Sequence, residues 1–385
     1  MASGILDGVR VVEVSAFVAA PIAGATLAAL GADVIRVEQV GGGIDSHRWP
    51  IHEGRSLYRS GLDRGKRSIT LDLRSTRGQQ LVTDVIVRSG EDGGILVTNL
   101  GAKGWMSYER LVEARRDLIM IVISGAPDGG AAVDYTVNAG IGFPWVTGPE
   151  DWPNPVNHVL PAWDVATGLL TCTAILAAER HRRRTGEGQL VQLALSDVAL
   201  AVASHLGFVA EAALVDEPRG RFGNDLYGTY ARDFRTRDGR YVMVCALTRR
   251  QWKCLVEATG IAAAIAGLED LHKVDLADEG ARFIHRSEIS ALVEPWVAGR
   301  TLEEARAAFD AHEVLWGPYR TFKELVRDDP RASNLSASPL IFTSHSPIPA
   351  ADANEIGADT ASVLRDLLEL SDEALADLRE AGVIN

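Results

Sequence analysis

The chain has few of the residues that build disulfide frameworks or metal sites. It has only three cysteines in 385 residues, and no two of them have the spacing of a zinc-ligand pair. Its histidines form no H-x-x-x-H or similar grouping. The sequence therefore predicts neither a disulfide-stapled fold nor a metal centre. Cys172 lies in an apolar stretch, where a buried and inert thiol is expected.

Positive charge and long apolar runs are also scarce. Lys and Arg number 39 against 52 Asp and Glu, which gives a formal net charge of -13. Nucleic acid and anionic lipid repel such a surface, so neither is expected as a partner. No apolar run approaches the roughly 20 residues of a membrane span, and residues 1–8 do not resemble a signal peptide. We therefore expect a cytoplasmic protein.

The whole chain is 46% hydrophobic and long enough for two domains. Predicted strands and helices alternate along its first half. The predicted strands are residues 9–14, 33–38, 68–73, 94–99, 118–124 and 190–195. The predicted helices are residues 21–30, 76–89, 107–116, 165–184 and 196–214. Crossovers of this kind build a parallel sheet, and strands that are apolar on both faces indicate one covered on both sides.

The pattern changes near residue 218. Two short strands flank the turn Thr236–Gly239, which is typical of a hairpin, and helical segments follow to about residue 312. Residues 361–370 and 371–381 are two predicted closing helices, with Ser371 as an N-cap. We predict a Rossmann-like large domain at 1–200, completed by 330–385, and a smaller α+β domain at 223–318. The predicted linkers are 201–222 and 319–350.

The loop after the first strand, Ser15 to Pro21, lacks the G-x-G-x-x-G motif. A Rossmann dinucleotide site needs those glycines so that pyrophosphate can approach the helix, so their absence counts against an NAD enzyme. The helix N-terminus could still bind an anion at the carboxyl ends of the strands.

Two other loops carry cations. Residues 62–67, Leu-Asp-Arg-Gly-Lys-Arg, place three cations around a glycine just before a strand. Such a cluster could bind the phosphates of an adenosine 3′-phosphate pyrophosphate group, or it could be a solvated basic loop. Three glycines at 41–43 precede Arg48, either in a ligand-binding loop or in a surface turn.

Asp164 stands at the predicted start of the long helix 165–184. No metal cluster and no Ser/His pair stands beside it in the sequence, which favours a carboxylate nucleophile. The alternative is structural, because aspartate is a preferred N-cap. Asp134 is a second carboxylate in a loop-to-helix region, and the imidazole of His158 is either an acid/base or a bystander.

Several segments together resemble the family III CoA-transferases. They are VVEVSAFVAAPIAGATLAALGADVIRVE from Val11, KRSITLDL from Lys66, Thr98-Asn99, Asp134, Trp163-Asp164, RTGEGQ from Arg184, FRTRDGRYVM from Phe234 and the closing LLELSDEALADLREAGVI. The match is collinear over nearly the whole chain. The resemblance implies an interlocked, ring-like homodimer and an acyl-CoA substrate, with coenzyme A as part of that substrate and no permanently bound cofactor.

The resemblance also implies roles for particular residues. The family nucleophile falls on Asp164, and Arg48 and His158 are candidate substrate contacts. The positions that contact CoA fall on Phe17, Val18, Gln39, Leu62, Asp63, Arg64, Gly65, Lys66, Thr98, Asn99, Leu100, Lys103 and Ala131 to Asp134. The family often has Gln where this chain has Val18, and Arg or Lys where it has Gln39. Its racemases carry a His at the position of Val133, which counts against proton exchange here.

Within the family, SAFVAAP, GGGIDSHRWP and VNHVLPAWD resemble a subgroup that moves CoA within one molecule. That subgroup converts 2-methylfumaryl-CoA (mesaconyl-C1-CoA) to 3-methylfumaryl-CoA (mesaconyl-C4-CoA) through an aspartyl anhydride and an aspartyl-CoA thioester. Two alternatives stay open. One is intermolecular transfer between two carboxylic acids, and the other is a silent CoA-binding protein in which Asp164 only caps a helix.

Overall fold

The computed structural model describes residues 4–332, 338–349 and 351–385. The chain divides into two compact units. The first unit comprises Met1–Ile141, His158–Val215 and Asn334–Asn385. The second comprises Gly142–Asn157 and Asp216–Ser333.

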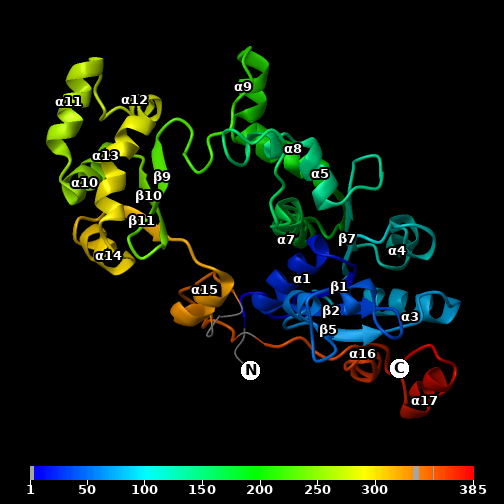
Figure 1. Cartoon of the computed structure of the whole chain (residues 1–385). Helices are drawn as coiled ribbons and strands as arrows, with labels where there is room; N and C mark the ends of the chain where they lie inside the picture. Colours follow the sequence, from blue (N-terminus) through cyan, green and yellow to red (C-terminus); the bar gives the residue numbers. More distant parts are fainter. Residues whose placement is uncertain (1–3, 333–337, 350) are drawn as a thin grey trace. The chain divides into compact units, whose positions relative to one another are not determined.

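The first unit is built on a six-stranded sheet with the order β5-β2-β1-β6-β7-β8, and all of its neighbours are parallel (Figure 1). The strands are β1 (Arg10–Val14), β2 (Asp33–Glu38), β5 (Arg67–Thr70), β6 (Ile95–Thr98), β7 (Ile119–Ser124) and β8 (Gln189–Ala194). Its central strands are buried on both faces, as expected of β-branched runs that a parallel sheet covers twice. The predicted α/β class with a parallel sheet is confirmed.

Helices cover both faces of this sheet, with α1 and α7 on one side and α16 on the other (Figure 1). The first layer contains α1 (Ala19–Ala29), α7 (Ala162–Thr185) and α8 (Leu195–His205). The second contains α3 (Thr76–Val87), α4 (Tyr108–Ala114), α16 (Thr360–Leu368) and α17 (Asp372–Glu380). Gly168 lets α7 approach α1, because a Cβ there would lie 2.7 Å from the Ala19 carbonyl oxygen. That close approach brings the starts of the two helices together.

The end of the chain returns to the edge strand β5. The Ser68 amide donates to Asp359 Oδ2 at 2.8 Å, and the Thr70 amide donates to Thr360 Oγ1 at 3.0 Å. Ser371 caps α17 by accepting from the Ala374 amide, which confirms the predicted N-cap. These contacts tie α16 and α17 to the first unit.

Several helix boundaries differ from the prediction. Helix α1 begins at Ala19, so Pro21 is its third residue. Helix α7 begins at Ala162, so Asp164 lies inside its first turn. The predicted helix 196–214 is broken into α8 and α9 (Phe208–Leu214), because Gly207 adopts a φ of 84°. The short elements of this unit are η1 (Ile44–His47), β3 (Ile51–His52), β4 (Arg55–Ser56), α2 (Leu57–Leu62), η2 (Gly104–Met106) and α5 (Asp134–Gly140).

The second unit has a three-stranded antiparallel sheet in the order β11-β10-β9, packed against helices. The strands are β9 (Tyr230–Arg235), β10 (Tyr241–Ala246) and β11 (Leu315–Pro318). The predicted hairpin is confirmed, because β9 and β10 pair antiparallel across the turn Thr236–Gly239. The helices are α6 (Phe143–Val146), α10 (Arg249–Thr259), α11 (Ala262–His272), α12 (Glu279–Ile284), α13 (Arg286–Ala298), α14 (Leu302–Ala311), α15 (Phe322–Asp328) and η3 (Pro330–Ala332).

The unit boundaries differ from the expected 1–200 and 223–318. Residues 142–157 join the second unit, where Arg221 Nε donates to the Trp145 carbonyl oxygen at 2.8 Å. The expected linker 201–222 contains the end of α8 and all of α9, and the expected linker 319–350 contains α15. These assignments depend on contacts between distant segments, which local sequence does not reveal. Residues 333–337 and 350 of the expected linker lie outside the described residues.

Within the described ranges, no single helix is long and apolar enough to cross a membrane. The bent pair α8 and α9 meets that criterion of length and composition only when its two helices are taken together.

Candidate active site

A cavity of about 580 Å³ opens in the first unit at the carboxyl ends of the parallel strands. It takes residues that follow β1, β6, β7 and β8, which is where ligands of open α/β sheets bind. Its volume suits a small-molecule ligand. The lining residues are Phe17, Val18, Ala19, Arg48, Trp49, Tyr58, Asn99, Ile123, Ser124, Gly125, Ala132, Val133, Asp134, Tyr135, Val159, Pro161, Asp164 and Leu195.

Eight of the predicted site residues therefore meet in one place: Phe17, Val18, Arg48, Asn99, Ala132, Val133, Asp134 and Asp164. The loop after β1 is held from both sides. The Ala16 amide donates to Asn99 Oδ1 at 2.9 Å, and the Phe17 amide donates to Asp45 Oδ2 at 2.8 Å. Phe17 has a φ of 65°, a strained backbone for a non-glycine residue, and these two hydrogen bonds secure it.

Asp134, rather than Asp164, caps helix α7. The N-cap position is Pro161, which has no side-chain acceptor. Asp134 Oδ2 instead accepts from the backbone amides of Trp163, at 2.7 Å, and Asp164, at 3.1 Å. The N-cap interpretation of Asp164 is therefore wrong. Asp134 is buried and already engaged by protein, so its role here is to position Asp164, and its predicted contact with CoA is not supported.

The Asp164 carboxyl is an unusually weak acid for an aspartate. Burial and, next, the negative charge of Asp134 raise its pKa, the Arg48 guanidinium lowers it, and the net result is a pKa of about 6. A carboxylate of higher pKa is a better nucleophile, and at pH 7 this one is still ionised. Asp164 is therefore charged, basic and facing the cavity.

Arg48 lines the same cavity as Asp164. Its guanidinium lies 4.4 Å from the centroid of the Tyr58 ring and 5.7 Å from that of Phe17. Both distances are within the range of a cation–π contact. The glycine-rich loop is therefore more than a surface turn, because it delivers Arg48 and the exposed Trp49 to the cavity.

Tyr58 is a site residue that the sequence did not reveal. It lies on the short helix α2 and lines the cavity. Its hydroxyl oxygen is buried and has no hydrogen-bond partner among the described residues. Burial raises the pKa of the phenol, and the charge of Asp164 raises it further, so the hydroxyl stays protonated. A tyrosine in an unpredicted helix carries no local signal, because its position depends on how residues 41–62 fold back.

The predicted phosphate-binding role of Lys66 is wrong. Lys66 is 2% exposed, and its ammonium group lies 2.9 Å from Glu13 Oε2, 3.2 Å from Asp63 Oδ1 and 2.9 Å from the Pro21 carbonyl oxygen. Gly24 makes room for this pair, because a Cβ there would meet Glu13 Oε2 at 1.8 Å. Lys66 and Asp63 are therefore structural residues.

These two residues belong to a buried ion network under the cavity. Arg36 Nη1 lies 2.7 Å from Glu13 Oε1, and Arg36 Nη2 lies 3.4 Å from Asp45 Oδ2. Arg59 Nη2 lies 2.6 Å from Glu38 Oε2. Neighbouring carboxylates raise the pKa of Arg36. Because Asp45 also accepts from the Phe17 amide, the network fixes the cavity wall to the sheet.

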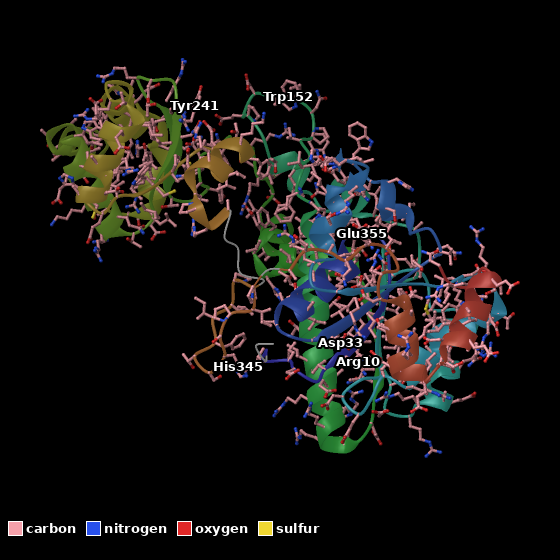
Figure 2. All side chains as sticks on the ribbon, turned by 90° about the horizontal axis from the view of Figure 1, so that it is seen from below. Arg10, Asp33, Trp152, Tyr241, His345 and Glu355 are labelled. Carbon is pink, nitrogen blue, oxygen red and sulfur yellow. The ribbon has the colours of Figure 1, made fainter. Side chains whose placement is uncertain are left out.

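The other predicted CoA positions do not line this cavity. Gln39 donates to Asp72 and accepts from the Leu73 amide, which is a structural role. Arg67 donates a hydrogen bond to Asp33. Asp33 also pairs with Arg10, and both of these residues are labelled in Figure 2. Of the three loop cations, Arg64 is the exposed one. The remaining predictions outside the lining are Leu62, Gly65, Thr98, Leu100, Lys103, Ala131 and His158.

Helices α1 and α7 both begin at the cavity, but their first backbone amides differ in whether they are already hydrogen-bonded. Asp134 occupies the first-turn amides of Trp163 and Asp164, so the start of α7 has none to spare for an oxyanion. Val18 is the N-cap of helix α1, and its side chain makes no capping hydrogen bond. Val18 and Ala19 both line the cavity. The start of α1 is therefore the better anion-binding end.

We expect the activity to fall in acid because Asp164 must be ionised to act as a nucleophile. With a pKa of about 6, the reactive fraction falls about tenfold per pH unit below that value. The measurement is the rate of CoA transfer from pH 4.5 to 8. An acid limb near the ordinary aspartate pKa would contradict the assignment.

Asp134→Asn is the matched control for that pH profile. The amide oxygen still accepts from the α7 amides, whereas the negative charge that raises the pKa of Asp164 is lost. The acid limb should therefore move to lower pH in this variant.

A carboxyl group of raised pKa and a guanidinium line one cavity at the carboxyl edge of a parallel sheet, an arrangement that suits an α/β enzyme of acyl-group chemistry. The sequence profile of CoA-transferase family III matches residues 6–344. The chain belongs to this family and is an enzyme that transfers CoA.

Individual relatives support that assignment. The chain is 48% identical to a 2-methylfumaryl-CoA isomerase of Chloroflexus aurantiacus over 400 aligned positions, covering 99% of this chain and 98% of the relative. It is 29% identical to a succinyl-CoA–D-citramalate CoA-transferase of the same organism, covering 98% of each. The crystal structure of a CaiB/BaiF family protein from Brucella suis aligns with a TM-score of 0.78 at 26% identity, covering 95% of this chain and 100% of that one.

Proposed function

We propose that this enzyme moves CoA within one molecule, converting 2-methylfumaryl-CoA to 3-methylfumaryl-CoA. The observation that carries the proposal is the basic carboxylate of Asp164 facing a cavity that also holds Arg48. The 48% identity to a 2-methylfumaryl-CoA isomerase supports the choice of substrate. No resident cofactor is required, because the protein itself supplies the nucleophile.

The reaction begins when an Asp164 oxygen attacks the thioester carbonyl. The C–S bond breaks and leaves a mixed anhydride and CoA thiolate. The thiolate then attacks the aspartyl carbonyl, which gives an Asp164–CoA thioester and free 2-methylfumarate. The second carboxylate of that acid attacks the new thioester and releases thiolate again. The thiolate finally attacks the substrate carbonyl of this second anhydride, which gives 3-methylfumaryl-CoA and restores Asp164.

Each of these steps passes through a tetrahedral oxyanion that needs hydrogen-bond donors. The start of α1 at Val18 and Ala19 is the supply we propose, in place of the α7 amides that Asp134 already occupies. Backbone donors fixed in a buried site stabilise such charges with no reorganisation.

Arg48 would hold whichever carboxylate of the diacid is not reacting. A guanidinium pairs well with a carboxylate, and its two aromatic neighbours fix its position. Holding the freed diacid beside the aspartyl thioester makes the return step effectively unimolecular. That confinement favours transfer within one molecule over transfer to an acid from solution.

We also propose that the protein works as an interlocked homodimer, as the family resemblance implies. Large apolar side chains on α7, α8 and α9 are exposed in the single chain, and they gather on consecutive helices. They include Leu169, Leu170, Leu176, Leu200, Leu206 and Val209. Apolar patches of this kind mark protein interfaces, and sedimentation of the purified protein at twice the chain mass would support the dimer.

The test of the reaction is incubation with 2-methylfumaryl-CoA alone, followed by chromatographic separation of the two regioisomers. A parallel sample contains isotopically labelled free 2-methylfumarate. Formation of 3-methylfumaryl-CoA without label supports transfer within one molecule. Label in the product, or a requirement for added acid, would assign an intermolecular transferase. No product in either sample would overturn the choice of substrate.

Tyr58→Phe should lower activity without weakening the fold. The lost hydroxyl is buried and makes no hydrogen bond with the described residues, so its removal leaves no partner unsatisfied. If the phenol donates to the reacting carboxyl groups, kcat should fall about 10- to 100-fold. The measurements are kcat and the unfolding midpoint in urea. An unchanged kcat would place the phenol outside the chemistry.

A further inference from the structure

Two histidines and one glutamate converge in the second unit. His272 is the last residue of α11, His285 separates α12 from α13, and Glu288 lies in the first turn of α13. His272 Nε2 lies 2.7 Å from Glu288 Oε1, and His285 Nδ1 lies 2.8 Å from Glu288 Oε2. The three atoms that could bind a metal all lie within 4.8 Å of one another.

We propose that these three side chains form a Zn²⁺ site, with water completing the coordination. Two imidazole nitrogens and one carboxylate oxygen are a donor set that Zn²⁺ takes in proteins. In sequence, thirteen positions separate the two histidines, so no short metal motif is present. The fold itself brings the donors together.

The backbone between the two histidines is held firmly in place. Arg282 is fully buried, and its guanidinium donates to the carbonyl oxygens of Leu276 at 3.0 Å and Ala277 at 2.9 Å. The Leu276 amide donates to Glu269 Oε1, one helical turn before His272. These bonds tie α11 and α12 to the loop between them, and they help to position the ligands before an ion arrives.

The geometry and charge of the cluster suit an entering cation. The side chains of His272, His285 and Glu288 are 30%, 14% and 43% exposed, so solvent reaches the cluster. Both imidazoles contact the carboxylate of Glu288. Tetrahedral Zn²⁺ places its ligand atoms about 3.3 Å apart. The two contacts, which reach different oxygens of Glu288, would open by about half an ångström, and ligand atoms that lie up to 4.8 Å apart would move closer together.

Proton balance is simple in this site. A ring nitrogen that donates to Glu288 gives up its proton when Zn²⁺ takes the nitrogen lone pair. In a neutral imidazole the other ring nitrogen carries the proton instead, and an imidazolium releases one proton to solvent.

The test uses the full-length protein, stripped with EDTA and dialysed, and titrated calorimetrically with ZnCl₂ at pH 7.5. We expect one ion per chain with a micromolar or lower Kd, and a rise of about 3 °C or more in the unfolding temperature at saturation. In His272→Gln the amide still donates to Glu288 but the imidazole ligand is lost. Its Kd for Zn²⁺ should be at least about tenfold higher.

His285→Gln provides a second variant, and His312→Gln provides the control. His312 is an exposed histidine of the same unit that contacts the Ala308 carbonyl oxygen and is no part of the cluster. Its variant should bind Zn²⁺ as the unchanged protein does. The proposal is overturned if the unchanged protein neither binds Zn²⁺ nor gains stability with it, or if both His272→Gln and His285→Gln keep full affinity.

Discussion

Asp164→Asn should abolish CoA transfer and at the same time make the protein more stable. An amide oxygen cannot form the anhydride, so kcat/KM should fall at least about 10³-fold. The folded protein raises the carboxyl pKa to about 6 from an ordinary 3.8. A carboxyl group whose pKa is higher in the folded protein than in the unfolded chain favours folding at low pH, where it is protonated. That contribution to stability is lost as the pH rises through the pKa of the folded protein. At pH 7 the neutral amide should therefore add about 3 kcal/mol to the free energy of unfolding.

The two readouts together separate the nucleophile from a structural role. Activity is measured by chromatography of the CoA esters, and stability by urea unfolding at pH 7 and pH 5, where the gain should shrink. An asparagine that retained activity would show that the carboxylate is not the nucleophile. If Asp164→Asn had a lower free energy of unfolding than the unchanged protein, the inference that the buried Asp164 carboxylate destabilises the fold would be wrong.

Lys66→Met should destabilise the fold strongly. The ammonium group is buried between Glu13 and Asp63, with distances of 2.9 and 3.2 Å. Removing it leaves buried carboxylates without their counter-charge, which costs about 3–5 kcal/mol. The measurement is the free energy of unfolding in urea. If Lys66 instead bound CoA phosphates, the KM for the CoA ester would rise and stability would hardly change.

Arg64→Met is the matched control, because it removes an exposed cation only two positions away. Its free energy of unfolding should stay within about 0.5 kcal/mol of the unchanged protein. Should the loop still contribute to phosphate binding, Arg64 is the cation that solvent and ligand can reach, and this variant would raise KM.

The sequence predicts the architecture of the first unit well because strand and helix periods are local signals. The β-branched runs at β1 and β2 and the helix α3 lie within two residues of their predicted places. Helix starts were less predictable. The predicted helix 21–30 starts at Pro21, yet α1 begins two residues earlier, at Ala19, where the loop after β1 is held by Asn99 and Asp45. Both partners are distant in sequence.

The candidate site was predictable as a set of residues but less so in their roles. Asp164 and Asp134 were both singled out, and only their geometry shows that Asp134 performs the capping that local sequence ascribed to Asp164. Lys66 follows an exposed glycine, so the local sequence predicts a surface cation. Its ion-pair partners, Glu13 on β1 and Asp63 directly after α2, lie in segments that only the fold brings together. The place of Tyr58 in the cavity could not be predicted, because it depends on how residues 41–62 fold.

The buried ion network has a consequence for how the enzyme responds to ionic strength. Dissolved ions screen charges that water can reach, and they screen buried pairs much less. The chain from Arg36 through Asp45 to the Phe17 amide is inaccessible to salt, and it fixes one wall of the cavity. An exposed cation such as Arg64 is screened fully. Added salt should thus change capture of the CoA ester, because it screens both the exposed cation and the field of the net charge of -13, while it leaves the chemical steps nearly unchanged.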